Sequence, residues 1–415
     1  MKTLNEMGAL AKEASRKLCL VSSKTKNDAL CKMAQALNDN ADIIIEKNTI
    51  DIENAKKKGI SKAMLDRLTL TPQRIKQMAD GILKVVDLGD PIGSMDSVTV
   101  RPNGLQIGKK RVPLGVIAII YEARPNVTAD AAALTLKTSN AVILRGGSEA
   151  INSNKILVDI MNSAALEAGM PDGCLQLVED TDRATAVELM RLKEYVNVLI
   201  PRGGAGLIKS VVENSTVPVI ETAAGNCHTY IDDSADLDMA LKIAVNAKCQ
   251  RPAVCNAMET LLVSDKVAEK FLPMLDKAMK EFNVEIRGCE ITRKYIPSAA
   301  EATEKDYATE FNDYILAVKV TKSIDEAMEH IAKYSTGHSE AIITNSYENS
   351  GRFLNEVDSA AVYVNASTRF TDGFEFGFGA EIGISTQKLH ARGPMGLEAL
   401  TTIKYVICGN GQIRG

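Results

Sequence analysis

The 415-residue chain has no tryptophan, only 8 phenylalanines and 10 tyrosines, and a formal net charge of −4. Because aromatic side chains are so few, we expect no base-stacking platform for nucleic acid. The charge provides no broad basic field for nucleic acid or an anionic membrane. No apolar run approaches the length of a membrane span. We therefore expect neither nucleic acid nor a membrane as a partner.

Metal-ligand patterns are also missing. The eight cysteines are scattered without a CxxC pair, and the four histidines show no ligand spacing, so no metal site is expected. Scattered thiols in a chain of this length favour a reducing compartment. The amino-terminal segment is charged and lacks the apolar core of a signal peptide. Together these features predict a cytoplasmic enzyme or binding protein.

Hydrophobic periodicity predicts an α/β protein. Residues 1–90 have helical spacing, and residues 97–101 and 105–111 form a predicted hairpin around Asn103-Gly104. Short apolar strands then alternate with helices, which implies two parallel-sheet α/β domains. The predicted strands are 116–120, 141–144, 174–178, 196–200 and 217–220, followed by 260–263, 315–320, 341–344 and 361–364. Residues 374–383 are predicted as a glycine-rich loop, 394–400 as a short helix, and 401–408 as a strand. This last strand can pair with the hairpin, either within the chain or across a dimer.

Cys255 lies in the stretch KCQRPAVCNAMETLL, between a helix-like run and a strand-like run. Pro252 should end the helix, which leaves Cys255 on a short connection. A cysteine held on such a loop can serve as a nucleophile. The sequence of this stretch alone favours the other reading, a small buried hydrophobic residue, because most cysteines outside disulfides are of that kind.

Two glycine turns each follow a predicted strand and open a helix, and each begins with an arginine. They are Arg145-Gly146-Gly147-Ser148 and Arg202-Gly203-Gly204. This arrangement suits phosphate oxygens at a helix amino terminus, although small residues there also let a helix pack closely on a sheet. Asn126 follows Pro125 and could donate to an oxyanion or cap the next helix.

Two further candidates remain open on the residues alone. Glu221, at the end of a predicted strand, could be a general base or a solvated carboxylate. Cys227 and His228 are adjacent in sequence, and neighbouring strand residues point to opposite faces, so we do not expect them to act as a thiolate–imidazole pair.

Four segments resemble the γ-glutamyl phosphate reductases, a family within the aldehyde dehydrogenase superfamily. They are VPLGVIAIIYEARPNVTADAAALTLKTSNAVILRGG, QRPAVCNAMETLL, EFGFGAEIGIST and KLHARGPMGLEALTT. The resemblance implies an aldehyde-dehydrogenase-like fold with a nicotinamide-cofactor domain (1–96 and 112–225), a catalytic domain (226–392) and a small β oligomerisation element (97–111 and 400–415). It also implies a homo-oligomer.

The family pattern assigns roles to individual residues. It implies Cys255 as the nucleophile, with Asn126 and the Cys255 amide as oxyanion donors. Arg145 and Ser148 stand where the superfamily contacts the adenosine ribose, and an arginine and a serine there favour NADPH over NADH. Glu310 matches the residue that holds the nicotinamide ribose. Arg124, Arg251 and Glu381 are candidates for substrate recognition, and Glu221 stands where hydrolytic relatives keep a general base.

The implied activity is NADPH-dependent reduction of γ-glutamyl phosphate to glutamate 5-semialdehyde and phosphate, through a cysteine thioester, in proline biosynthesis. A glutamate 5-kinase is a candidate partner, since it would supply the labile substrate. Two other classes stay in view: a thiol acyltransferase or hydrolase without a nicotinamide site, and a nucleotide-binding module without chemistry.

Overall fold

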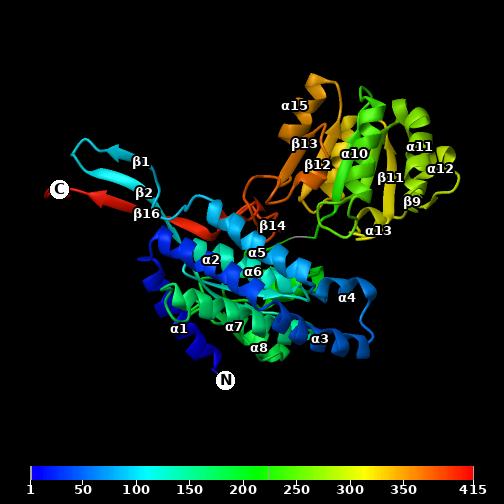
Figure 1. Ribbon diagram of the computed structural model, residues 1–415. Helices are drawn as coiled ribbons and strands as arrows, with labels where there is room; N and C mark the ends of the chain where they lie inside the picture. The colour runs from blue at the N-terminus through cyan, green and yellow to red at the C-terminus, as the bar shows by residue number, and fades with distance from the viewer. Residues whose placement is uncertain (1, 223, 415) are drawn as a thin grey trace. The chain divides into compact units, whose positions relative to one another are not determined.

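The computed structural model describes residues 2–222 and 224–414 (Figure 1). The chain divides into two compact units. Unit 1 comprises Met1–Thr222, Gly377–Gly383 and Met395–Gly415, and unit 2 comprises Ala223–Phe376 and Ile384–Pro394. None of the helices in the described part of the chain is long and apolar enough to cross a membrane.

Unit 1 opens with a run of helices, as the periodicity predicts: α1 (Leu4–Leu18), α2 (Ser23–Asp39), α3 (Ala41–Lys57), α4 (Lys62–Leu68) and α5 (Pro72–Asp87). Local sequence fixes where they begin. At α5, for example, the Thr71 hydroxyl accepts the Arg74 N–H, and Pro72 occupies the first helical position, where no N–H is needed.

The sheet of unit 1 is parallel and has the order β5-β4-β3-β6. Its strands are β3 (Val116–Tyr121), β4 (Ala141–Arg145), β5 (Leu175–Leu177) and β6 (Val198–Arg202), and the helices between and after them are α6 (Pro125–Lys137), α7 (Ile151–Glu167), α8 (Arg183–Met190) and α9 (Ala205–Asn214). Every residue of β3 is buried, as expected for a strand with both faces covered.

The predicted strand at 217–220 does not form; only an isolated bridge joins Val219 to Leu199. The segment still lies beside β6, because Leu199 donates to the Pro218 carbonyl and Ile220 donates to the Leu199 carbonyl. Pro218 has no N–H to extend this ladder, so the pairing stays too short to count as a strand.

A small antiparallel sheet joins distant parts of unit 1, in the order β1-β2-β16 (Figure 1). It contains β1 (Met95–Val100), β2 (Gln106–Pro113) and β16 (Thr401–Cys408). Gly104 closes the hairpin turn at φ 86°, a conformation that favours glycine. Strand β16 pairs with β2 over eight residues, from Thr401 opposite Pro113 to Cys408 opposite Gln106, so of the two predicted alternatives the structure has the pairing within the chain.

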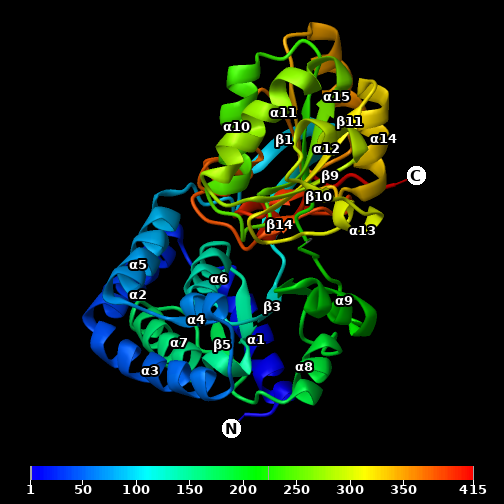
Figure 2. The ribbon, with the colours of Figure 1, turned by 90° about the vertical axis from the view of Figure 1, so that its right-hand side faces the viewer.

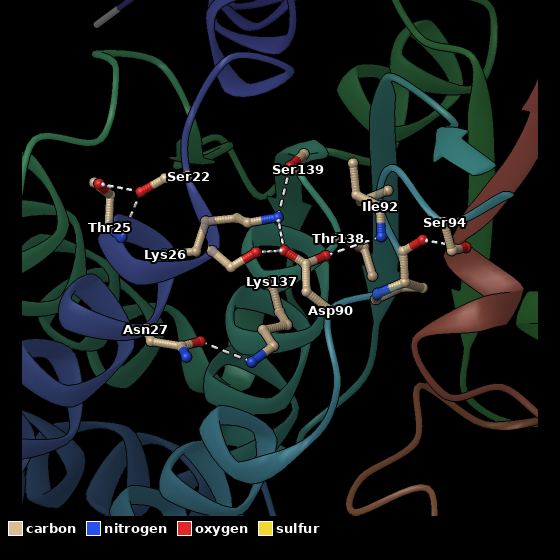
Figure 3. Close-up of polar contacts among 12 residues, drawn as sticks. Ser22, Thr25, Lys26, Asn27, Asp90, Ile92, Ser94, Lys137, Thr138 and Ser139 are labelled. Atoms are coloured by element: carbon tan, nitrogen blue, oxygen red, sulfur yellow. Dashed lines mark hydrogen bonds and ion pairs between the residues drawn. The ribbon is translucent and has the colours of Figure 1, made fainter. Parts of the chain in front are cut away.

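A buried polar cluster ties α2 to the end of α6 and to the segment before β1 (Figure 3). Lys26 Nζ lies 2.5 Å from Asp90 Oδ2 and donates to Ser139 Oγ at 3.0 Å. The Ile92 N–H donates to Asp90 Oδ1 at 2.9 Å. Because the Lys26 side chain is only 1% exposed, this ion pair is shielded from solvent.

Unit 2 has a seven-stranded parallel sheet in the order β10-β9-β11-β8-β7-β12-β13. Its strands are β7 (Cys227–Ile231), β8 (Met258–Ser264), β9 (Glu285–Gly288), β10 (Ala300–Glu301), β11 (Ile315–Thr321), β12 (Ser339–Ile343) and β13 (Ala361–Val364). Its helices are α10 (Leu237–Cys249), α11 (Asp265–Lys280), α12 (Glu290–Tyr295), α13 (Glu304–Tyr307), α14 (Ile324–Tyr334) and α15 (Tyr347–Glu356). The strand pattern did not predict β7, β9 and β10.

Helices cover both faces of this sheet (Figure 2). Neighbouring strand residues alternate between two apolar clusters, as the period of a strand requires. Tyr230, Leu262 and Ile342 pack in a cluster with residues of α14 and α15. Ile231, Leu261 and Ile343 pack in another with residues of α10 and α11.

The segment after β13 is mostly irregular. Residues 374–383 form the predicted loop. The predicted short helix at 394–400 is wrong at its start: β14 (Ile384–Ser385) pairs with β15 (Gly393–Pro394), and only the 3₁₀ turn η3 (Glu398–Leu400) is helical. Pro394 is held in this pairing by Ile384, which takes it out of reach of a helical turn.

Candidate active site

Cys255 lies on the connection between α10 and β8, as predicted from the proline at 252. Helix α10 ends at Cys249, and β8 begins at Met258. The Cys255 side chain is half-buried, so part of it reaches the surface of unit 2. Its carbonyl accepts a hydrogen bond from Cys227 Sγ at 3.2 Å, and Ala257 N–H donates to Val254 O at 3.0 Å. The loop is thus a turn fixed at its backbone.

Asn256 anchors the same loop to the segment after β13. Its buried Nδ2 donates to the carbonyls of Thr371 at 2.9 Å and Arg369 at 3.2 Å. In return, Thr368 Oγ1 donates to the Asn256 carbonyl at 2.7 Å. Three hydrogen bonds on one residue hold the backbone next to the thiol in a single arrangement, which is what a nucleophile on a rigid support requires.

Gly225 connects Glu310 to the backbone of Cys255. Its N–H donates to Glu310 Oε1 at 2.8 Å. A Cβ built on Gly225 would overlap the Cys255 carbonyl group, so only glycine fits. Glu310, the predicted ribose ligand, and the backbone of Cys255, the predicted nucleophile, therefore both lie next to Gly225.

Arg369 is a charged residue near Cys255 that was not predicted from the sequence as a site residue. Its Nε donates to Gln250 Oε1 at 3.0 Å. Burial lowers the pKa of Arg369, and the charge of Arg251 lowers it further, whereas a thiolate at Cys255 acts in the opposite direction. The signal was present: TRFTDG follows β13, and loops at the carboxyl ends of parallel strands are the usual place for site residues.

Cys227 and His228 have separate partners, as the strand geometry predicts. Both are buried in β7. Cys227 Sγ lies 3.6 Å from His338 Nδ1, whereas His228 Nδ1 lies 3.2 Å from Glu340 Oε2. Burial raises the pKa of Cys227 well above its ordinary value, so this thiol does not ionise near neutral pH.

Asn126 lies in the first turn of α6 in unit 1. The helix is capped at Arg124 without a side-chain hydrogen bond, and Pro125 occupies its first position. The alternative role of Asn126 as a helix cap is therefore excluded. Its exposed amide Nδ2 donates instead to Asp130 Oδ2, one turn along, at 3.4 Å.

In the Arg145 turn, the arginine donates to backbone carbonyls, and a glycine lies next to the Glu149 carboxylate. Arg145 Nη2 donates to the carbonyls of Thr181 at 2.9 Å and Asp182 at 3.3 Å, while its buried Nε has no hydrogen-bond partner. Burial lowers the pKa of Arg145. Ser148 opens the 3₁₀ turn η1 (Ser148–Ala150), and the Glu149 carboxylate lies so close to Gly147 that a Cβ there would overlap it.

The second glycine turn already holds a carboxylate. Gly204 is the N-cap of α9, and its N–H donates to Glu122 Oε2 at 3.0 Å. A Cβ on Gly203 would lie 2.6 Å from the Glu122 carboxyl carbon. The anionic group at this helix amino terminus is thus a side chain of the protein, and the predicted role of the turn toward a cofactor phosphate stays a prediction.

Comparisons with known proteins agree over the whole chain. Residues 2–292 match the model of the aldehyde dehydrogenase family. The chain is 64% identical, over 98% of its length and 98% of the relative's, to a γ-glutamyl phosphate reductase from Carboxydothermus hydrogenoformans. The chain belongs to the γ-glutamyl phosphate reductase family, within the aldehyde dehydrogenase family.

Solved structures of this family share the fold. The crystal structure of a γ-glutamyl phosphate reductase from Thermotoga maritima superposes with a TM-score of 0.97 at 49% identity, with 100% of each chain covered. An engineered glycolyl-CoA reductase with bound NADP⁺ is 14% identical, with a TM-score of 0.71 and coverage of 98% of this chain and 96% of that one. The latter likeness shows the fold alone.

The remaining candidate site residues of this γ-glutamyl phosphate reductase belong to both units. Arg124, Glu221 and Glu381 belong to unit 1, where Arg124 is exposed and the two glutamates are half-buried. Arg251 is exposed on the Cys255 loop of unit 2. In the described part of the chain, no group of three or more His, Cys, Asp or Glu side chains could hold a metal ion.

Proposed function

We propose that this protein reduces γ-glutamyl phosphate to glutamate 5-semialdehyde and phosphate, with Cys255 as the nucleophile, as a step of proline biosynthesis. Membership of the γ-glutamyl phosphate reductase family over the full length supports the reaction. The observation that carries the assignment of the nucleophile is the half-buried Cys255 thiol on a loop fixed by Asn256 and Cys227.

The chemistry follows from these residues. The Cys255 thiolate attacks the carbonyl carbon of the acyl phosphate, and phosphate leaves, so that a thioester forms. Asn126 Nδ2 and the Cys255 N–H donate to the oxygen that becomes negative, a kind of contact worth about 3–4 kcal/mol when it is preorganised. NADPH held by the Arg145 and Arg202 turns would supply a hydride to the thioester carbonyl carbon, which would give a hemithioacetal. Collapse of the hemithioacetal releases the aldehyde and returns the thiolate.

An arginine pair accompanies the thiol. Arg369 and Arg251 bring positive charge toward Cys255, which favours the ionised thiol, since an ordinary thiol with a pKa of about 8.5 is only slightly ionised at pH 7. We assign Arg251 to the substrate as well, with Arg124 and Glu381 as further candidates.

The cofactor site fits unit 1 residues. The unpartnered Arg145 Nε and the anion-binding Gly204 amide suit phosphate groups, and Arg202 with Gly203 completes the second turn. In the first turn we assign Gly146 and Gly147 to the cofactor site as well; their Cβ positions face the side chains of Asn154 and Glu149. Arg145 and Ser148 favour the 2′-phosphate of NADPH, and Glu310 would accept hydrogen bonds from the nicotinamide ribose. The negative charge of Glu149 acts on Arg145. For a phosphate to bind here, the positive charge of Arg145 must outweigh the charge of Glu149.

The cofactor preference has its own test. Arg145→Ala should weaken binding of NADPH much more than binding of NADH, measured by fluorescence titration. Glu149→Gln should favour NADPH, because it removes a charge that repels the 2′-phosphate. Equal losses of both cofactors in Arg145→Ala would contradict the assignment.

Three further assignments belong to this proposal. Residues 1–96 and 112–225 would bind the cofactor, residues 226–392 would carry the catalytic thiol, and the β1-β2-β16 sheet would join subunits of a homo-oligomer. A glutamate 5-kinase is the proposed source of the substrate, by direct contact. A cytoplasmic location fits the eight cysteines outside disulfides.

The reaction is tested in reverse, with glutamate 5-semialdehyde, phosphate and NADP⁺, by the rise in absorbance at 340 nm. Cys255→Ala should abolish the rise, while Cys31→Ala, at an exposed thiol on α2, should keep the wild-type rate. No phosphate-dependent rise with the wild type would overturn the proposed reaction. In a separate assay, release of glutamate from γ-glutamyl phosphate without NADPH, faster than in the absence of the protein, would point to a hydrolase.

A further inference from the structure

We propose that Asp130 is a positioning residue for Asn126: its carboxylate selects the orientation of the Asn126 amide that turns an N–H toward the reacting oxygen. The inference rests on the proposed function, in which Asn126 is an oxyanion donor. It adds a residue that neither the motifs nor the assigned roles include.

The geometry places the two side chains on one face of α6. Residues four apart on a helix are neighbours, and Asn126 Nδ2 donates to Asp130 Oδ2 at 3.4 Å. Helix α5 passes close by with Gly81, where a Cβ would lie 3.8 Å from Asp130 Oδ1. The half-buried Asp130 side chain therefore lies beside α5, while Asn126 is exposed at the start of α6.

The chemistry of the amide gives this contact its consequence. A carboxylate only accepts hydrogen bonds, so it can face Nδ2 but not Oδ1 of Asn126. One N–H of Nδ2 then points to Asp130, and the other N–H is left for a ligand. If Asp130 is protonated, it can donate to Asn126 Oδ1. The amide would then be flipped, with Oδ1 instead of Nδ2 facing Asp130. The charge state of Asp130 therefore decides which orientation dominates.

That charge changes within the range of an assay. Burial raises the pKa of Asp130 to about 6, and the hydrogen bond from Asn126 and the charge of Arg202 oppose this rise. The charge of Arg202, at the end of β6, acts on Asp130, and α5 places Gly81 beside its carboxyl group. Asp130 is ionised above about pH 6 and becomes neutral below it, so activity should fall as pH drops through this value.

The test uses the reductase assay on the full-length protein. In the wild type, log kcat should fall with a slope of about one as the Cys255 thiolate is lost. An additional fall of about fivefold, seen as a break in slope, should be centred near pH 6. Asp130→Asn should lower kcat about fivefold at pH 7.5, the shift that loss of about one net hydrogen bond allows. In this variant the slope should stay at one, and the KM for NADPH should not change.

Two additional variants separate positioning from mere structure. Asn126→Ala should lower kcat about a hundredfold, and adding Asp130→Asn to it should change kcat no further. Gly81→Ala suits the interior of α5 and brings a methyl group against the Asp130 carboxyl, so it should move the break in slope to higher pH. Asp159→Asn, on α7, is the matched control and should leave the profile as in the wild type.

The outcomes are distinct. Additive effects of Asp130→Asn and Asn126→Ala, or a break in slope that survives Asp130→Asn, would overturn the inference. If Asp130→Asn does not fold, an unmoved break in Gly81→Ala would overturn it instead. Absence of reductase activity in the wild type would reject the proposed function, whereas a wild-type rate in Asp130→Asn beside a damaged Asn126→Ala would reject this inference alone.

Discussion

At the scale of single residues, burial makes three of the cysteine thiols, Cys174, Cys227 and Cys249, chemically quiet, whereas Cys255 is half-buried. Burial raises the pKa of Cys249 to about 11 and that of Cys174 to about 12, and burial also raises the pKa of Cys227. These side chains therefore stay protonated at neutral pH and behave as small apolar residues. Cys255 differs from these three cysteines because it is half-buried and lies on the loop anchored by Asn256.

This difference predicts an order of alkylation. With limiting iodoacetamide at pH 7, Cys255 should be modified well before Cys249 and Cys227, and modification should parallel loss of activity. Timed digestion and mass spectrometry measure both. Raising the pH to 9 should leave Cys249 slow, because its pKa stays above that pH. Equal rates for Cys249 and Cys255 would contradict an activated Cys255.

At the scale of elements, the amino terminus of α9 is occupied by the Glu122 carboxylate at the end of β3. A cofactor phosphate at the same amide must displace this side chain. We expect Glu122→Ala to bind NADP⁺ about two- to fivefold more tightly, the range of a charge at an exposed helix terminus. Calorimetric titration measures the change, and Glu213→Ala, at the far end of α9, is the control. Weaker binding in Glu122→Ala would mean that Glu122 supports the cofactor.

The Lys26–Asp90 pair predicts how unit 1 responds to acid (Figure 3). Burial alone would raise the pKa of Asp90, but hydrogen bonds from Lys26, Ser23 and Ile92 lower it further than burial raises it. A carboxyl with a depressed folded-state pKa stabilises the fold above its unfolded pKa of about 3.9 and loses this effect as pH falls through the folded value.

Asp90→Asn should therefore lower the free energy of unfolding by about 3 kcal/mol at pH 7, because it leaves the buried Lys26 charge without its counterion. The difference from the wild type should shrink below about pH 4. Urea unfolding followed by circular dichroism gives both values. Asp28→Asn removes an exposed ion pair with Lys24 on the same helix and should have almost no effect.

At the scale of the whole molecule, the β1-β2-β16 sheet exposes apolar side chains that a subunit interface would cover. Ile403, Tyr405 and Ile407 alternate along β16 and are 43%, 60% and 59% exposed. We expect Tyr405→Lys with Ile407→Lys to reduce the mass seen by light scattering. Lys404→Glu, on the opposite face of β16, should have little effect. An unchanged mass in the double variant would remove the sheet from the interface.

Sequence patterns predicted most of this architecture, and the exceptions have physical causes. Buried apolar strands such as β3 and β4 were evident, whereas β7 was not, because CHTYI buries polar groups whose partner, Glu340, lies on β12. The Cys255 loop followed from Pro252. Asp130 and Glu122 were not singled out, because their meaning depends on which neighbour each carboxylate reaches, and spacing alone does not reveal that.

Gly225 is a position that a redesign of this enzyme cannot change without moving the backbone of Cys255. Its α-carbon lies against the carbonyl of Cys255, and its N–H donates to Glu310, so even a methyl group would displace the backbone of Cys255. A mutagenesis library should recover active clones with changes at exposed Arg251 far more readily than at Gly225. Altered substrate range is therefore to be sought in loop side chains, with this glycine left untouched.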